Sequence, residues 1–462
     1  MNQKPEDFSR RNFIKTASAV GAGIAVSSAG KTLFADKSQA TPATKSKKLL
    51  RCAIIGAGKQ GRILLRDALK IPGLHFVAAC DIWQRYSLRY AASKIKSANR
   101  RIAGLAKDQI KPRKYVDYKE MLEKEKNLDA VIIATPDFVH AEQTIACLEK
   151  GINVYCEKEM SNNLKGAASM VRAMKKSGKL LQIGHQRRSN PVYLGALELL
   201  QKDKICGRVT NCYAQWNRAA HKLAAPSKKY PIPQELLKKF GYENIVQFAN
   251  WRWYKKYSAG PVADLGSHQI DIFGWFLNSH AQSVLASGSK SYYKNRQWYE
   301  DVMAIYKYKS RAGEVQAFYQ VLNTNSFGDY FERFMGDRGT LTISEDINNC
   351  YFAPEQAAEL PAYFKSLKTR QIKGMQAYGL VDIISAKSAS LGKRINQLQS
   401  LGGNKSIHGL HLENFFDAVA GRAKLNCPAD VAYPTAVEVL NVLPAIKSAK
   451  AHSFKESDFK VS

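Results

Sequence analysis

A glycine-rich turn between a short apolar segment and a helix constrains the fold of this chain more than any other feature. Residues 49–55 are Leu-Leu-Arg-Cys-Ala-Ile-Ile, which predicts a short buried strand, and the pattern GxGxxG follows at 56–61. Its first glycine permits a tight turn, the second lets the backbone approach a pyrophosphate, and the third allows close helix packing. The helix expected over 62–70 points the positive end of its dipole at the phosphates. The predicted cofactor-binding residues of this turn are Gly56, Gly58, Lys59, Gln60 and Gly61.

An acidic residue follows the next apolar segment. Residues 75–80 predict a second strand, and Asp81 comes directly after it, 20 residues beyond Gly61. A carboxylate at this distance accepts hydrogen bonds from the adenosine ribose hydroxyls and repels a 2′-phosphate. We therefore expect NAD rather than NADP, a preference that Arg85 weakens. The alternative interpretation of Asp81 is a turn residue at the end of a strand.

Further along the chain, strands and helices alternate, which predicts a parallel, doubly wound sheet. We expect a third strand over 128–134, an amphipathic helix ending at Lys150, and strands over 153–156 and 179–184. Ligands bind at the carboxyl ends of such strands, so the residues that follow them share one rim. The predicted cofactor-binding residues on this rim are Thr135, Pro136, His140, Glu157 and Lys158.

These motifs resemble those of the glucose-fructose oxidoreductase, inositol dehydrogenase and rhizopine-catabolism family, abbreviated Gfo/Idh/MocA. The resemblance runs from about residue 49 to about residue 451 and includes the segment 260–271. It implies an α/β fold, with an NAD-binding Rossmann domain over 49–188 and a substrate and oligomerisation domain over 189–462. In the second domain it implies an open, mostly antiparallel sheet and C-terminal helices that pack back between the domains.

The segment 260–271 contains an acid and a histidine four residues apart, Asp264 and His268. At the start of a helix this spacing puts both side chains on one face, where the carboxylate can orient the imidazole. The resemblance places both at the family's catalytic positions, with Lys158 contacting the reacting hydroxyl and the Asp/His pair relaying its proton. The family usually has Glu-Lys-Pro where this chain has Glu157-Lys158-Glu159, so the turn loses a rigid φ and Lys158 gains a carboxylate neighbour.

Aromatic and charged residues of the second domain are candidates for binding a sugar. Flat aromatic faces suit sugar C–H groups, and burial in the core explains the same residues equally well. The aromatic residues concerned are Trp216, Trp251, Trp253 and Tyr254, with His221 as a further candidate for the cleft. The predicted substrate-binding residues are Arg187, Trp216, Arg218, Tyr254 and Asp271.

Cysteine and histidine spacing predicts no metal site. None of the eight cysteines forms a CxxC pair. In an oxidising compartment, a disulfide between Cys206 and Cys212 is an alternative to two free thiols. His408 and His411 are three apart on a helix expected over 408–418, but Glu413 would point away from their face. Another helix is expected over 431–445.

Charge and hydropathy narrow the class of protein. The chain has 462 residues, enough for two domains, and 70 Lys and Arg against 39 Asp and Glu, a formal charge of +31. The basic residues are spread along the chain without a nucleic-acid-binding motif, so we interpret them as a solvated surface. No apolar run reaches the roughly 18 residues that span a bilayer, so no stable membrane anchor is predicted.

The first residues resemble an export signal. Ser-Arg-Arg-Asn-Phe-Ile-Lys at 9–15 precedes a mild apolar stretch over 17–30, the pattern of a twin-arginine signal. We therefore assign residues 1–48 to a signal and linker and predict a periplasmic or otherwise exported protein that meets the twin-arginine translocase. A poorly ordered basic terminus is the alternative.

Three functions fit the sequence. The first is an NAD-dependent oxidoreductase acting on a sugar, a cyclitol or a derivative, with its cofactor tightly bound because free NAD is not expected outside the cytoplasm. The second is a redox-neutral, NAD-dependent glycosidase like those of glycoside hydrolase family 109, and the third is a non-enzymatic basic binding protein. The open sheet of the family also implies a homo-oligomer.

Overall fold

The computed structural model describes residues 49–372, 374–400 and 406–461. The predicted twin-arginine signal and linker, residues 1–48, lie outside these ranges. None of the described helices is long and apolar enough to cross a membrane.

The first part of the chain forms a six-stranded parallel sheet in the order β3-β2-β1-β4-β5-β6. This confirms the predicted doubly wound sheet, and the strand order reverses between β1 and β4, where such folds bind ligands. The strands are β1 (Leu50–Ile55), β2 (Leu74–Cys80), β3 (Arg113–Tyr115), β4 (Ala130–Ile133), β5 (Asn153–Cys156) and β6 (Leu181–Ile183). The main helices are α1 (Lys59–Ala68), α2 (Arg89–Asn99), α4 (Tyr118–Lys124), α5 (Asp137–Glu149) and α6 (Leu164–Ser177).

Two details of this sheet differ from the prediction. Strand β3 was not predicted, because two of its three residues, Arg113 and Lys114, are exposed and basic and give no apolar signal. The strand expected third is therefore the fourth. Helix α1 begins at Lys59 rather than Arg62, so its first turn lies inside the glycine motif.

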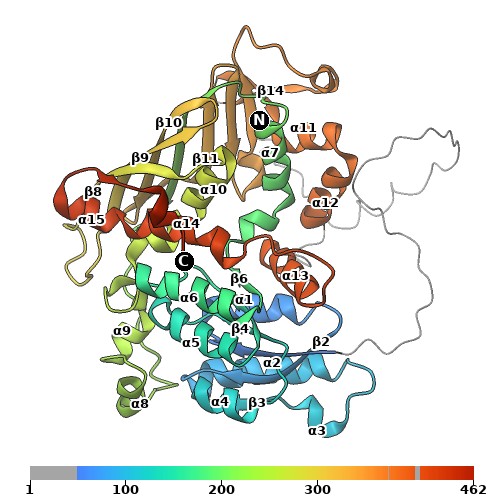
Figure 1. Ribbon diagram of the computed structural model, residues 1–462, viewed down its shortest axis with the longest axis vertical. Coiled ribbons are helices and arrows are strands. Elements are labelled where there is room, and N and C mark those ends of the chain that lie inside the picture. The colour runs from blue at the N-terminus through green and yellow to red at the C-terminus, as the bar shows by residue number, and fades with distance from the viewer. Residues whose placement is uncertain (1–48, 373, 401–405, 462) are drawn as a thin grey trace, which may run out of the picture. The chain divides into compact units, whose positions relative to one another are not determined.

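Helices from the end of the chain cover this sheet together with its own crossover helices. Apolar residues of α13 (Ile407–Val419) join α1 and α2 in one core, and those of α14 (Ala429–Leu440) join α6 in the core on the other side. Figure 1 shows α13 and α14 between the Rossmann sheet and the larger sheet. Both faces of the parallel strands are therefore buried, as their continuous apolar runs require.

The helix expected over 431–445 is two helices, α14 and α15 (Val442–Ser448). The break is at Asn441, whose Nδ2 donates to the Val437 carbonyl oxygen at 2.9 Å. Pro444 follows three residues later and lacks the N–H that would continue the first helix.

The second sheet has ten strands in the order β14-β15-β13-β12-β11-β7-β10-β9-β8-β16. Of its pairs, β10 with β7 is parallel and the others recorded are antiparallel, which confirms an open, mostly antiparallel sheet. Helices α7 (Pro191–Gln201) and α10 (Ser267–Leu277) pack on one face (Figure 1). The central strands are β7 (Val209–Arg218), β8 (Ala281–Ser289), β9 (Asp301–Ser310), β10 (Gly313–Leu322), β11 (Asn325–Gly336) and β12 (Gly339–Ile343). The remaining strands are β13 (Tyr351–Pro354) and β15 (Met375–Gly379), together with β14 (Thr369–Ile372) and β16 (His452–Ser453) at the two edges.

All eight cysteines are buried free thiols, so Cys206 and Cys212 do not form the disulfide considered in the sequence analysis. The Cys206 Sγ lies 3.8 Å from the Phe334 carbonyl oxygen as a weak donor. Burial raises the pKa of the Cys206 thiol to about 12, which keeps it protonated and unreactive.

Candidate active site

A cleft of about 1270 Å³ runs from the glycine turn to the beginning of α10. Single small-molecule sites commonly occupy roughly 300–1,000 Å³, so this cleft has room for a cofactor and a second molecule. Residues from both domains line it, including Gly58 and Asp81 at the Rossmann end and Trp216 and His268 at the other.

The three glycines of the motif differ in their surroundings. Gly56 has φ +86°, and a Cβ there would lie 2.7 Å from the Ala134 backbone. A Cβ on Gly61 would lie 2.1 Å from the Gly56 carbonyl oxygen, so Gly61 permits packing and does not itself line the cleft. A Cβ on Gly58 would meet nothing within 4 Å, which leaves the open space that a pyrophosphate needs at the N-terminus of α1.

Asp81 lies at the end of β2 and lines the same end of the cleft. Its Oδ2 accepts from the Ala57 N–H and its Oδ1 accepts from the Trp83 N–H, both at 2.7 Å. Burial raises the pKa of the Asp81 carboxyl, against the effect of these two donors. Each carboxylate oxygen keeps a lone pair for a ribose hydroxyl. Asp81 therefore holds the glycine turn as well as facing the cofactor space.

The loops after β4 and β5 form the middle of the cleft. Thr135, Pro136, Glu157 and Lys158 line it, and the Gln60 Nε2 donates to the Glu157 Oε1 at 3.1 Å. This bond joins the glycine turn to the loop that positions Lys158.

His140 lies outside the lining of the cleft in which we predicted it to contact the cofactor. The ring is 1% exposed, and its two nitrogens lie 2.7 Å from the carbonyl oxygens of Thr135 and Glu159. Burial opposes a charge on the ring, but Cys156, Asp137 and the Glu159 carbonyl raise the pKa of His140 to about 10. A protonated ring donates to both carbonyls, so His140 ties together the loops after β4 and β5.

Lys158 and Asp264 meet at the centre of the cleft. The Lys158 Nζ donates to the Asp264 backbone carbonyl and lies 3.5 Å from its Oδ1, while the Arg252 Nε donates to the same Oδ1 at 3.0 Å. Although burial opposes ionisation, Arg252 and Lys158 hold the pKa of the Asp264 carboxyl well below its usual range. A carboxylate shared by two cations is a firm anchor for the Lys158 side chain.

His268 lies beside this group, on the first turn of α10. Its ring centroid is 5.6 Å from that of Trp216, and its Nδ1 has no hydrogen-bond partner among the described residues. Burial, followed by the positive charges of Lys158 and Arg187, holds the pKa of His268 well below its usual value. The imidazole is therefore neutral, with its Nδ1 left unpaired.

Asp264 was predicted to orient the His268 imidazole, but no hydrogen bond joins these two side chains in the described part of the chain. Asp264 lies in a π-helical turn over Val262–Gly266, where the i to i+5 spacing replaces the regular i to i+4 alignment. Its carboxylate turns to Lys158 and Arg252 instead. Asp264 thus positions the lysine rather than the histidine.

Two of the predicted substrate-binding residues line the cleft, Trp216 and Arg218. The Trp216 ring stacks on Tyr330 with centroids 4.9 Å apart, and the Arg218 guanidinium lies 5.3 Å from the Trp216 centroid. Of the other aromatic candidates, Trp251 also lines the cleft.

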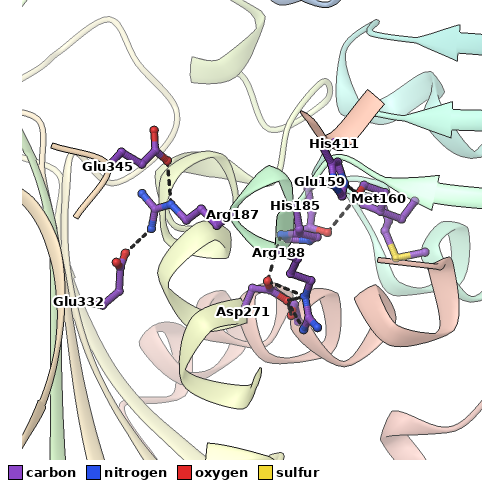
Figure 2. Close-up of polar contacts among 11 residues, drawn as sticks. Glu159, Met160, His185, Arg187, Arg188, Asp271, Glu332, Glu345 and His411 are labelled. Atoms are coloured by element: carbon purple, nitrogen blue, oxygen red, sulfur yellow. Dashed lines mark hydrogen bonds and ion pairs between the residues drawn. The ribbon is translucent and has the colours of Figure 1, made fainter. Parts of the chain in front are cut away.

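The remaining three, Arg187, Tyr254 and Asp271, lie outside the lining of the cleft in which we predicted them to contact substrate. Figure 2 shows Arg187 between Glu332 and Glu345, and Arg188 paired with Asp271. Asp271 also accepts from the Thr435 Oγ1 at 3.1 Å, and Tyr254 packs against Tyr257. Arg187 and Asp271 are each only 1% exposed. Their ion pairs join segments that are far apart in the sequence.

The two histidines considered for a metal separate in the structure. His408 lines the cleft, whereas the buried His411 lies 2.6 Å from the Ser189 Oγ and 2.9 Å from the Ile183 carbonyl oxygen. Within the described ranges, no group of three His, Cys, Asp or Glu side chains is arranged to hold a metal ion. His221 and Trp253 pack against each other outside the lining.

The sequence analysis named Trp251, Trp253 and Tyr254 but missed Arg252, which lies among them. Residues 219–257, here called the strap, contain α8 (Gln234–Lys239), α9 (Ile245–Ala249) and the short turn Trp251–Trp253. Its aromatic content was the available signal, since Phe240, Tyr242, Phe248 and Trp251 all line the cleft.

The strap is held to the Rossmann domain on both sides of the cofactor space. The Trp83 Nε1 donates to the Tyr230 carbonyl oxygen at 2.7 Å, and the rings of Tyr86 and Tyr230 stack at 5.4 Å. At the start of α5, Phe138 contacts Tyr242 edge-on at 5.5 Å. Figure 1 shows α8 and α9 running alongside the Rossmann sheet.

Comparison with known proteins identifies the family. Residues 50–185 match the oxidoreductase family with an NAD-binding Rossmann fold, and residues 236–342 match the Gfo/Idh/MocA C-terminal domain. The chain belongs to the Gfo/Idh/MocA family. Its cofactor is NAD, and the predicted family resemblance is confirmed.

Relatives of this Gfo/Idh/MocA chain include dehydrogenases of cyclitols. Inositol 2-dehydrogenase of Salmonella paratyphi B is 26% identical over 237 residues, 51% of this chain and 56% of that one. The chain thus spans little more than half the length of this relative. The scyllo-inositol 2-dehydrogenase (NAD(+)) of Bacillus subtilis is 25% identical over 300 residues, 64% of this chain and 73% of that one.

A solved structure shows the same fold. The WlbA dehydrogenase from Bordetella pertussis, in complex with NADH and UDP-GlcNAcA, has a TM-score of 0.62 and 16% sequence identity. The match covers 88% of this chain and 99% of that one.

Proposed function

We propose that this chain is an exported NAD-dependent oxidoreductase that acts on a sugar, a cyclitol or a derivative of one. One observation carries the proposal: Lys158 and a neutral His268 lie together in a cleft that begins at the glycine turn. Relatives named for inositol oxidation support a ring polyol as substrate. The aromatic faces of Trp216 and Trp251 in the cleft suit such a ring.

The polar residues fit the two parts of alcohol oxidation. Oxidising a secondary alcohol removes a hydride from carbon and a proton from oxygen, and bound NAD supplies the hydride acceptor. Lys158 would donate to the hydroxyl oxygen and stabilise negative charge on it, while the neutral His268 takes the proton. Asp264 and Arg252 hold Lys158 in place. In the reverse direction His268 returns the proton.

The strap supports a cofactor that stays bound. It lies over the space beside Gly58 and Asp81 and is attached at Trp83, Tyr86 and Phe138. Release of a dinucleotide would require these aromatic contacts to open. Such retention suits an enzyme exported in folded form by the twin-arginine route, the destination we propose from residues 9–30.

A retained cofactor also favours a second candidate, redox-neutral cleavage of a glycoside. In that reaction a ring hydroxyl is oxidised, the adjacent carbon loses a proton, the aglycone is eliminated, water adds to the resulting double bond, and the carbonyl is reduced again. Lys158 and His268 would serve this chemistry equally well.

Product analysis separates the two candidates. NAD-loaded protein is incubated with a panel of sugars, cyclitols and their aryl glycosides, and the products are identified by mass spectrometry. A ketone or lactone supports the oxidoreductase, whereas a released aglycone with no change in total redox state supports the glycosidase. A protein that binds NAD but converts no member of the panel would favour the third interpretation, a binding protein.

The outer face of the large sheet supports a homo-oligomer. On β8 and β9, Leu285, Met303 and Ile305 are 46%, 48% and 42% exposed. Apolar side chains grouped on an open sheet are typical of a protein interface, so we propose that copies of this chain associate there. Sedimentation of the purified protein tests this.

A further inference from the structure

Arg218 is a charged side chain in the cleft that no carboxylate of the described residues pairs with directly. It is the last residue of β7, it is exposed, and its side chain makes no ion pair or hydrogen bond within the described part of the chain. Its guanidinium lies over Trp216, 5.3 Å from the ring centroid. Stacking on an indole holds the guanidinium plane in one orientation and leaves its N–H donors free at the edge.

Arg252 leaves further donors free in the same cleft. Its Nε donates to Asp264, and its guanidinium lies 4.2 Å from the Trp251 centroid. The two terminal nitrogens make no hydrogen bond among the described residues, and the side chain is 47% exposed. Two arginines, each stacked on a tryptophan, therefore line one cleft with unused donors.

The neighbouring carboxylates are already engaged. Asp264 is shared by Lys158 and Arg252, Glu345 pairs with the buried Arg187 at 2.8 Å, and Glu157 accepts from Gln60. None of these three carboxylates forms a hydrogen bond or ion pair with Arg218, although the positive charge of Arg218, after those of Arg252 and Lys158, helps to lower the pKa of Asp264.

The position of Arg218 separates it from the cofactor phosphates. Its platform, Trp216, contacts His268 at the reacting end of the cleft, whereas the space for the pyrophosphate lies beside Gly58 at the other end. An anion held by Arg218 would therefore belong to the substrate.

We propose that the substrate carries an acidic group, such as the carboxylate of a hexuronic acid, which binds Arg218 and the terminal nitrogens of Arg252. This inference rests on the proposed function, since it names the substrate class of the same cleft. A planar guanidinium matches a carboxylate with two parallel hydrogen bonds, which a neutral hydroxymethyl group cannot replace.

The test compares each acid with its neutral parent: glucuronate with glucose, galacturonate with galactose, and mannuronate with mannose. Binding to the full-length, NAD-loaded protein is measured by calorimetry, and reduction of the bound nicotinamide is followed by absorbance. In at least one pair the uronate should bind about tenfold or more tightly than the hexose, the size expected for a charge-assisted hydrogen bond. Arg218→Gln should remove most of that ratio, and Arg218→Lys should retain part of it.

Arg311→Gln is the matched control, because Arg311 is exposed in the turn between β9 and β10 and lies outside the cleft. It should leave the ratio unchanged. Equal binding of acid and parent in all three pairs, or no binding of any uronate, would overturn the inference. So would a preference that survives Arg218→Gln. Oxidation of neutral sugars without an acid preference would leave the oxidoreductase standing, whereas Arg218-dependent uronate binding without nicotinamide reduction would count against the oxidoreductase alone.

Discussion

Lys158 is the residue that we propose stabilises the reacting oxygen, and its position is fixed by neighbouring side chains. Its Nζ contacts Asp264 by backbone and side chain, and Arg252 shares the same carboxylate. We expect Lys158→Met to lower kcat/KM by about two orders of magnitude or more, because a positioned charge on the reacting oxygen is lost. The NAD content of the purified variant should stay close to that of the original protein. Near-normal turnover of the best substrate would remove Lys158 from the mechanism.

Asp81 is the residue to which we assign the preference for NAD over NADP. Asp81→Ser should weaken NAD binding and relax discrimination against NADP, because it removes the charge that repels a 2′-phosphate. It also removes the acceptor of the Ala57 and Trp83 N–H groups, so a lower melting temperature should accompany the change. Affinities for both nucleotides, measured beside Asp108→Ser on the exposed α3 (Lys107–Ile110), provide the comparison. If the original protein binds NADP as tightly as NAD, the assignment of Asp81 is wrong.

At the scale of elements, the glycine turn separates packing from cofactor binding. Gly58 has φ −67° and open space around its Cβ position, so Gly58→Ala should fold normally and bind NAD at least about tenfold more weakly. Gly61→Ala should instead lose folding stability, because its Cβ would meet the Gly56 carbonyl oxygen at 2.1 Å. Thermal melting and NAD titration of both variants distinguish the two effects. Unchanged NAD affinity in Gly58→Ala would place the pyrophosphate elsewhere.

Helix α14 docks on the large sheet through a buried carboxyl that makes stability depend on pH. Glu438 accepts from the Ala281 N–H and bonds the Tyr308 hydroxyl at 2.7 Å. Burial raises its pKa to about 8, against about 4.3 in an unfolded chain. The folded state therefore binds more protons between these values, and its stability falls as the pH rises from about 5 to 8.

Glu438→Gln should reduce that fall, because the amide cannot ionise and can keep both hydrogen bonds. Melting temperatures measured across this pH range check the prediction. Equal slopes for the two proteins would show that Glu438 ionises without a penalty in the folded state.

Sequence patterns predicted the elements whose signal is local. Neighbouring residues alone are enough to predict the glycine turn, the alternation of strand and helix, and the buried strands β1, β2, β4 and β5. Strand β3 was missed because its pairing with β2, rather than its own composition, makes it a strand. The start of α1 at Lys59 and the break between α14 and α15 at Asn441 depend on backbone geometry. The spacing of apolar residues gives no information about either point.

Side-chain partners in the cleft were harder to predict than the elements that carry them. Lys158, Asp264 and His268 were identified, but their pairing was not, because a π-helical turn changed the register of Asp264. Arg187 and Asp271 were predicted to bind substrate. In the structure, Arg187 pairs with Glu332 and Asp271 pairs with Arg188, each from a distant segment. Arg252 was missed because only the folded strap brings it to Asp264.

In the whole molecule, we propose, the strap covers the Rossmann cleft and keeps NAD in place while a sugar or polyol hydroxyl is oxidised. The most direct measurement is to purify the exported form without added nucleotide, quantify its bound NAD, and add the best substrate of the panel. We expect close to one NAD per chain, nicotinamide reduction within the protein, and turnover that does not depend on free NAD once a second substrate reoxidises the bound nicotinamide. Protein that is empty on purification, and that works only when soluble NAD is consumed in proportion to product, would contradict this proposal.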